Sequence, residues 1–423
     1  MGVRLPATVR DAGTWLRRFA ATTPGAIGLV LIATTVACLL AGLTVGQQLD
    51  AKIVRADQVL DRTEPLAFAA QSLYVSLSAA DAGAATAFLS GGIESPQVRD
   101  TYEQALAESA AALAEATAGA TDAQTRAIVA RIAADLPTYT GLVETARANN
   151  RQGFPVGSAY LRQASDLMQT SLLPNAEQLS DARFAAVRED QQRIGALPWT
   201  SVVLLALVLA LCALGSIVLL RRTNRLVNTG LATAAGLTLV ALLWTVGATL
   251  TAAHLLDTGD SGAGARVENL AGARILAQQA RTDETLALIT RGDITPTEQS
   301  YQHHIGDLHQ HLTAAGAADS AADRALANWN AGHNAQRTAY EKADYTGAVT
   351  QAIGTGPDSS ATSFARLDQE LRTDLAAARD DLRDGVAGAA NAVTLSPFGT
   401  LILLIAALGA VISGLWPRIK EYL

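Results

Sequence analysis

Cysteine is scarce in this chain, and both copies, Cys38 and Cys212, lie inside long apolar runs. The polar stretches therefore hold no disulfide framework, even if they face an oxidising compartment. Aromatic residues are also few, at 5% of the chain. Many positions between helices in the polar stretches are then Ala, whose small side chain lets helices approach closely but buries little apolar area.

Charged residues are missing from four apolar runs, and about 20 residues at ~1.5 Å rise each suffice to cross a bilayer. The runs are therefore expected to be transmembrane helices at residues 25–46, 199–220, 229–253 and 398–416. Together with the helix-forming composition of the remaining chain, they predict an all-α fold with four transmembrane helices.

The short segments that flank these runs are basic. They are the arm at 1–24, the link at 221–228, which holds Arg221, Arg222 and Arg225, and the tail at 417–423. The positive-inside rule places all three in the cytosol, with both termini inside a plasma membrane. The two long segments, 47–197 and 254–397, are then extracytoplasmic, and the three arginines form the expected cytosolic contact surface.

An alternative for the first run is a cleaved or lipidated signal. Arg17–Arg18–Phe19 has some likeness to a twin-arginine signal, and Thr35–Val36–Ala37–Cys38 has some likeness to a lipobox. The run is long for a signal peptide, and threonine replaces the usual leucine, so a retained anchor is the favoured interpretation.

The net charge of −7 excludes several function classes. Because basic residues concentrate on the cytosolic flanks, the outer segments are more acidic than the whole chain. This charge distribution argues against nucleic acid as a partner. Membrane lipids are expected partners of the apolar runs. No phosphate loop, nucleophile elbow or zinc-protease motif occurs. We therefore expect no enzyme activity and no cofactor.

Each outer segment is predicted to form a four-helix bundle. Breaks in the first lie at Ser90–Pro96, Ala118–Asp122 and Gln152–Pro155, where turn and capping residues gather. Pro174 and the stretch Gly354–Asp358 disturb the fourth helices. Each is interpreted as a tolerated bulge or loop, which is favoured, or as a hinge or a contact site for a ligand or protein.

The second segment repeats the plan of the first. Phe88–Pro96 matches Leu288–Pro296 position for position, and Tyr139 and Trp329 begin equivalent third-helix stretches. A tandem duplication is the favoured interpretation. The alternative is chance similarity between two Ala-rich helical segments.

Four histidine and aspartate side chains on one predicted helix are the best metal candidates: His303, His304, Asp307 and His311. Residues three or four apart share a helix face. The first segment has no matching histidines, so a solvated polar face is favoured and no metal is expected.

Polar residues near the distal turns could bind a ligand or partner. They are Arg99, Tyr102, Tyr160 and Arg162 in the first segment, and Arg291, Tyr301, Asp344 and Tyr345 in the second. An arginine in a bundle groove suits a carboxylate. For any single residue, surface solvation is the alternative.

The motifs Gln152–Gly153–Phe154 and Ala343–Asp344–Tyr345, each leading into a fourth helix between two spans, resemble the four-helix-bundle sensor domains of bacterial chemoreceptors and sensor kinases. No output module follows either return span. The tandem form is similar to actinobacterial four-span transducers that link a glutamine-binding-type solute-binding lipoprotein to the soluble Ser/Thr protein kinase G.

This resemblance implies a signal transducer that senses amino acids. It further implies a solute-binding lipoprotein outside and a Ser/Thr kinase inside, with a homodimer or an internal pseudo-dimer as the assembly. The alternative function is a non-switching envelope scaffold or membrane-complex subunit.

Overall fold

The computed structural model describes residues 23–90, 96–223, 228–257, 259, 262–290 and 292–420, and every regular element in these ranges is a helix. The chain divides into two compact units. The membrane unit comprises Met1–Asp57, Gln192–Leu255 and Ala387–Leu423. The second unit comprises Gln58–Gln191 and Leu256–Val386, and we call it the sensor unit after the resemblance given above. The all-α expectation is confirmed for the described residues.

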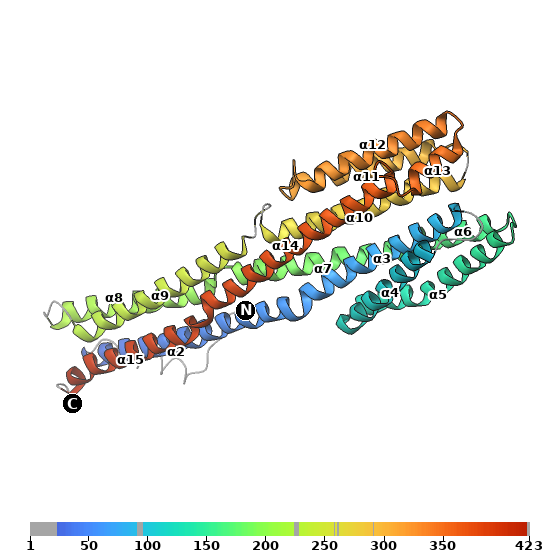
Figure 1. Ribbon diagram of the computed structural model, residues 1–423. Coiled ribbons are helices and arrows are strands. Elements are labelled where there is room, and N and C mark those ends of the chain that lie inside the picture. The colour runs from blue at the N-terminus through green and yellow to red at the C-terminus, as the bar shows by residue number, and fades with distance from the viewer. Residues whose placement is uncertain are drawn as a thin grey trace, which may run out of the picture. The chain divides into compact units, whose positions relative to one another are not determined.

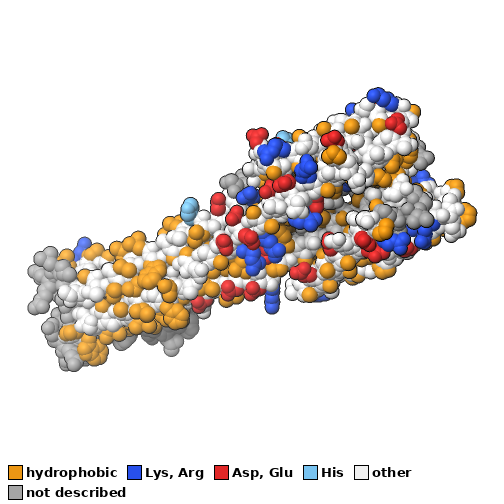
Figure 2. Space-filling model, viewed as in Figure 1, with side chains coloured by type: hydrophobic (Ala, Val, Ile, Leu, Met, Phe, Trp, Pro, Cys, Tyr) orange, Lys and Arg blue, Asp and Glu red, His pale blue; other side chains and the backbone are white. Residues whose placement is uncertain are grey.

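The membrane unit is built on four helices that are long and apolar enough to cross a membrane. They are α2 (Thr23–Gln58), α8 (Trp199–Thr223), α9 (Thr229–Leu256) and α15 (Ser396–Lys420). In Figure 2, hydrophobic side chains form broad patches on this unit, whereas most charged side chains lie on the sensor unit. The basic arm at 1–22, most of the link (224–227) and the last three tail residues lie outside the described residues.

Small residues line the core of the membrane unit. Ala41, Ala234, Ala241 and Ala407 are fully buried there, beside both cysteines. Lipid tails are as apolar as Leu, so transmembrane helices associate through close packing, which small side chains permit.

The closest approach in this unit joins the start of α9 to α15. A Cβ added to Gly414 would lie 2.6 Å from Gly230 Cα and 2.7 Å from Asn228 Oδ1. Asn228 Oδ1 accepts a hydrogen bond from Gly230 N at 3.0 Å, and Asn228 Nδ2 donates to the Gly414 carbonyl at 3.2 Å. Only glycine fits at this crossing.

The sensor unit contains the helices of both long polar segments, shown in Figure 1. We call the first set the first-half helices: α3 (Glu64–Leu89), α4 (Pro96–Gly119), α5 (Ala123–Arg151), α6 (Gly157–Leu167) and α7 (Leu173–Gly195). The second-half helices are α10 (Ala263–Thr290), α11 (Thr295–Ala314), α12 (Ala321–Glu341), α13 (Tyr345–Ile353) and α14 (Ser360–Thr394). Contacts join α3 to α4, α10 to α11, and α3 to α10.

The helix ends follow the expected turn chemistry. The Asp122 side chain accepts a hydrogen bond from Thr125 N at 2.8 Å and caps α5. After α5 and α12 the chain turns through a left-handed residue, Gly153 (φ 74°) and Ala343 (φ 59°) respectively. The sequence comparison paired Gly153 with Asp344. The backbone instead matches Gly153 to Ala343, because Asp344 already caps α13 by accepting from Gly347 N.

Two prolines follow single π-helical turns. The turn η1 (Val59–Thr63) precedes Pro65, and η2 (Met168–Leu172) precedes Pro174. Proline has no N–H to donate to the carbonyl four residues earlier, and a wider turn relieves the clash. The disturbance expected at Pro174 is thus a π turn within a continuous helix, whereas 354–359 separates α13 from α14.

We predict that Gly414→Ala lowers the thermal unfolding midpoint of the purified full-length protein, because overpacking at a close helix crossing costs about 1–3 kcal/mol. Differential scanning fluorimetry in detergent measures this. The matched control is Gly409→Ala on the same helix, where an added Cβ meets nothing within 4 Å. Equal midpoints for the two variants would contradict the close crossing.

Candidate functional site

A carboxylate lies buried on the first helix of each half. Asp81 follows Leu73 and Leu77 at four-residue spacing, so α3 carries it on the same face as these core leucines. In the second half, Glu284 on α10 is 1% exposed. A buried carboxylate is stable only with donors around it, so each acid selects the side chains that face it.

Asp81 is surrounded by hydroxyl groups. Tyr139 Oη on α5 donates to one carboxylate oxygen at 3.2 Å, and Ser165 Oγ on α6 donates to the other at 2.9 Å. Burial raises the pKa of Asp81 to about 6, and these hydrogen bonds only partly offset that rise. No cation pairs with Asp81 among the described residues, so the acid holds its proton in mildly acidic surroundings.

Glu284 has the same kind of partners and a cation in addition. Trp329 Nε1 on α12 donates to Glu284 at 3.3 Å and to Ser360 Oγ at 3.0 Å, and the Ser360 hydroxyl donates to Glu284. Arg281 forms an ion pair with Glu284. Burial alone raises the pKa of Glu284, but Arg281 and the donors outweigh it and the net pKa is lowered.

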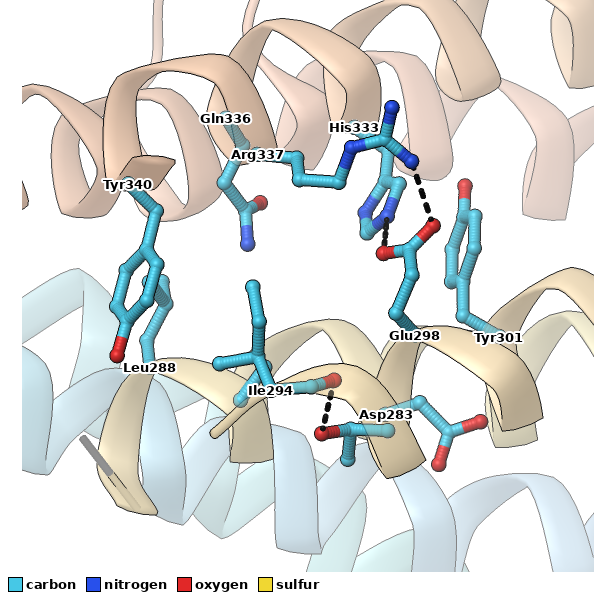
Figure 3. Close-up of a pocket in the computed structure, with 11 residues that line it drawn as sticks. Asp283, Leu288, Ile294, Glu298, Tyr301, His333, Gln336, Arg337 and Tyr340 are labelled. Carbon is cyan, nitrogen blue, oxygen red and sulfur yellow. Dashed lines mark hydrogen bonds and ion pairs between the residues drawn. The ribbon is translucent and has the colours of Figure 1, made fainter. Parts of the chain in front are cut away.

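His333 on α12 lies between two carboxylates. Its Nδ1 is 3.2 Å from Glu284. Its Nε2 is 2.9 Å from Glu298 on α11, which also accepts from Arg337 at 3.1 Å (Figure 3). Both ring nitrogens therefore face acceptors, and only the protonated ring can donate to both. Burial lowers the pKa of His333, but the two glutamates outweigh this effect and raise it overall.

Two of the four predicted tyrosines, Tyr102 and Tyr301, lie beside these buried acids rather than on the surface. Both are at most 2% exposed, and neither buried hydroxyl has a partner among the described residues. Tyr301 stacks on His333 with ring centroids 3.6 Å apart, and Arg147 lies 5.4 Å over the Tyr102 ring. Each tyrosine is therefore part of a buried network in its half.

The cavity beside Tyr301 is small. It measures about 20 Å³ and is lined by His333, Glu298 and Tyr340, among others (Figure 3). That volume holds about one water molecule and no metabolite. This network can therefore gain or lose a proton, but it does not enclose a substrate.

The remaining predicted distal residues do not converge on one site. Arg99 and Arg162 are exposed, and Tyr160 packs against the first-half core. Asp344 caps α13, while Tyr345 donates to the Leu288 carbonyl at 2.9 Å and lines a cavity of about 590 Å³ between the two halves. Arg291 lies outside the described residues.

The histidines proposed as metal candidates point to separate partners. His303 lies 3.4 Å from Asp307, His304 lies 2.8 Å from Asp283, and His311 lies 3.0 Å from the Asn269 side chain. Within the described part of the chain, no group of three or more His, Cys, Asp or Glu has the geometry of a metal site.

Of the three arginines expected to contact the cytosol, Arg221 is exposed at the end of α8. The Arg222 side chain and Arg225 lie outside the described residues.

Sequence reasoning missed Asp81, Glu284, His333 and Glu298. A usable signal existed for Asp81, because an acid at the spacing of core leucines marks a buried charge. The His333 contacts had no such signal, since its partners lie 35 and 49 residues away in the chain.

Comparison with known proteins gives one match. Residues 55–192, which include the Asp81 network, match the model of a family described as the actinobacterial sensor domain. No curated protein and no solved structure matches the chain.

We predict that the stability conferred by His333 is pH-dependent. The folded pKa exceeds the unfolded value, so the contribution is complete below a pH of about 6.5 and is lost as the pH rises through the folded pKa. The unfolding midpoint of the wild type should fall over this range, and that of His333→Gln should fall less. Exposed His309 supplies the control, His309→Gln. Parallel profiles for wild type and His333→Gln would refute the bridging role.

We predict that Asp81→Asn removes a second contribution to the pH dependence of the free energy of unfolding. Because the folded acid holds its proton up to a pH of about 6, the wild type loses stability as pH rises from about 4 to 6. The free energy of unfolding should fall by about 3 kcal/mol, because the pKa of Asp81 differs by about two pH units between the folded and unfolded states. Denaturant unfolding of the full-length protein measures the free energy of unfolding of wild type and variant. The difference between the two values should become smaller at low pH, where Asp81 is protonated. Asp166→Asn, at an exposed acid on α6, is the control.

Proposed function

We propose that this protein is a multi-pass membrane sensor that relays extracytoplasmic nutrient status to the cytosol. The match of residues 55–192 to the actinobacterial sensor domain carries the proposal. Four helices able to span a membrane support it, because they would connect a sensor unit to the opposite side. The relay requires no catalytic step by this chain.

The proposed topology places the sensor unit outside. Basic flanks at 1–24, 221–228 and 417–423 favour the cytosol, so residues 47–197 and 254–397 are extracytoplasmic. The sensor unit carries most of the charged side chains visible in Figure 2, as a water-facing unit should.

We further propose that the sensor unit is a tandem duplication of one four-helix bundle. The recurrence of the buried network supports this. Asp81 bonds to Tyr139 on α5 and Ser165 on α6, and Glu284 bonds to Trp329 on α12 and to Ser360 at the start of α14. Tyr102 and Tyr301 add a buried phenol on the second helix of each half. The two halves would act as an internal pseudo-dimer.

The contact between the halves offers the means of relay. Fully buried Glu64 on α3 forms ion pairs with Arg379 and Arg383 on α14. A ligand or partner that binds one arrangement of α3 and α14 more tightly than another would shift the population between them. Both helices are continuous with membrane helices, since one helix extends from Gly25 to Leu89 and another from Ser360 to Pro417.

Amino acids, delivered by a solute-binding lipoprotein, are the proposed stimulus, and a soluble Ser/Thr kinase is the proposed receiver. These partners come from the resemblance to tandem four-span transducers. Tyr345 and the cavity of about 590 Å³ that it lines offer the outer partner a surface shared by both halves.

An envelope scaffold is the second candidate function, favoured by the small cavity at the His333 network, which admits no metabolite. Affinity purification of tagged full-length protein separates the two. Recovery of a solute-binding lipoprotein and a kinase supports the relay. Recovery of only division or wall-synthesis proteins would replace it with the scaffold.

The topology gives a sharper prediction. Arg221→Cys should react with a membrane-impermeant maleimide only after cells are permeabilised, whereas Asp166→Cys should react in intact cells, because both positions are exposed on opposite sides in the proposed topology. The native Cys38 and Cys212 are buried and provide the background. Labelling of Arg221→Cys in intact cells would reverse the topology and remove the relay.

A further inference from the structure

A cavity lined by α3, α4, α10 and α14 shares no lining residue with the cavity at His333. It measures about 310 Å³, which is the size of a pocket for a small organic ligand. Arg274 on α10 and Arg372 and Arg379 on α14 line it, and Glu115 on α4 is the one acid among the described residues of the lining. The charged groups around this cavity are therefore mainly positive.

Two of these arginines share a single carboxylate. Asp368 on α14 pairs with Arg274 at 2.8 Å and with Arg372 at 2.9 Å. Burial raises the pKa of Asp368, but the two guanidinium groups outweigh this effect and lower the pKa overall, so Asp368 is ionised at neutral pH. Two guanidinium groups and one carboxylate leave one surplus positive charge.

The third arginine belongs to a second group of the same kind. Buried Glu64 on α3 is shared by Arg379 and Arg383 on α14, which leaves another surplus positive charge. Arg372 and Arg379 are seven residues apart on α14, a separation of about 10 Å along the helix axis. An occupant that neutralises both surplus charges therefore carries two negative groups joined by a short chain.

A buried amide supplies an independent sign of a ligand. Gln71 on α3 is 2% exposed and lines the cavity. Its Nε2 has no hydrogen-bond partner among the described residues. Buried polar side-chain atoms are normally satisfied, so an unpartnered N–H group in a cavity wall indicates an acceptor atom on an occupant. An acceptor that lies beside arginines is best supplied by an anion.

The remaining lining is largely apolar and indicates an organic occupant. Phe68, Leu375 and Pro65 contribute side chains together with two alanines, and the hydroxyl of exposed Ser72 is the other polar group. Arg379 lies 4.3 Å over the Phe68 ring, so the cationic and apolar walls adjoin. Inorganic anions present no hydrocarbon to such a wall. An aliphatic chain with a carboxylate at each end meets both demands.

We propose that this cavity binds a small aliphatic dicarboxylate. One carboxylate pairs with Arg372 and the other with Arg379, Gln71 Nε2 donates to a carboxylate oxygen, and the aliphatic chain lies against Phe68 and Leu375. Because α3 belongs to the first half and α14 to the second, the occupant stabilises one arrangement of these two helices. Its role as a stimulus rests on the proposed function, but its binding does not.

Binding is tested with purified full-length protein and succinate, by isothermal titration calorimetry at neutral pH and physiological salt. We expect saturable binding to the wild type, and weaker binding of acetate, which has one carboxylate. Arg372→Gln should weaken succinate binding about threefold, because it removes an exposed ion pair, and Glu115→Gln should strengthen it by a similar factor, because it removes a like charge. The matched control is Arg366→Gln, an exposed arginine on α14 outside the cavity, which should bind like the wild type.

Gln71→Leu separates ligand binding from a structural role. Replacing an unpartnered buried donor with an apolar side chain removes a desolvation cost, so the unfolding midpoint without succinate should not fall. The affinity for succinate should fall about tenfold, because a hydrogen bond to a charged group is lost. A lower midpoint with unchanged affinity would show that Gln71 serves the fold and not a ligand.

Four further results would overturn the proposal. They are no saturable binding of succinate, equal binding by wild type and Arg372→Gln, full displacement of succinate by an equal concentration of inorganic phosphate, and binding of an oligoglutamate peptide but not of succinate. Circular dichroism of each variant excludes misfolding as the cause of lost binding. Failure here leaves the maleimide and affinity-purification results unchanged, so it is distinct from failure of the proposed relay.

Discussion

The structure depends on the need to neutralise or satisfy carboxylates buried among small apolar side chains. The helices of the sensor unit pack largely through Ala and Leu, whose burial provides little shape specificity. Asp81 and Glu284 add that specificity, because each requires donors at defined positions on other helices of its half: α5 and α6 for Asp81, and α12 and α14 for Glu284. Removing one partner would leave a buried polar group unsatisfied, so the networks fix which helix faces pack together.

Ion pairs also hold helices together, both within the second half and between the two halves. Arg274 pairs with Asp368 at 2.8 Å within the second half, and Glu64 joins the halves through Arg379 and Arg383. Arg379 also lies 4.3 Å over the Phe68 ring, which adds a cation–π contact to the ion pair. Such polar contacts have discrete geometries, so a shift of one helix exchanges partners rather than deforming them. In the proposed relay, such an exchange would separate two arrangements of the helices.

Cavities of the sensor unit differ in size and in the helices that line them. The cavity at His333 admits about one water, the cavity lined by α7, α10 and α11 measures about 350 Å³, and the cavity at Tyr345 measures about 590 Å³. The last two are each lined from both halves. Occupancy of either would be felt by helices of both halves, which is the property that a relay requires.

Features that depend on local chemistry could be predicted from the amino-acid sequence. Uncharged runs of membrane-spanning length predicted the four apolar helices, and capping residues such as Asp122 predicted where helices begin. Both depend on neighbours within a few residues.

Which polar side chains are buried follows from the packing of the helices and could not be predicted from the sequence. Tyr102 and Tyr301 looked like surface ligand contacts, and the helical spacing of His303, His304 and His311 suggested one shared face. Helix spacing cannot show which neighbouring helix each side chain meets. The contacts of His333 with Glu284 and Glu298 form only when three helices pack together.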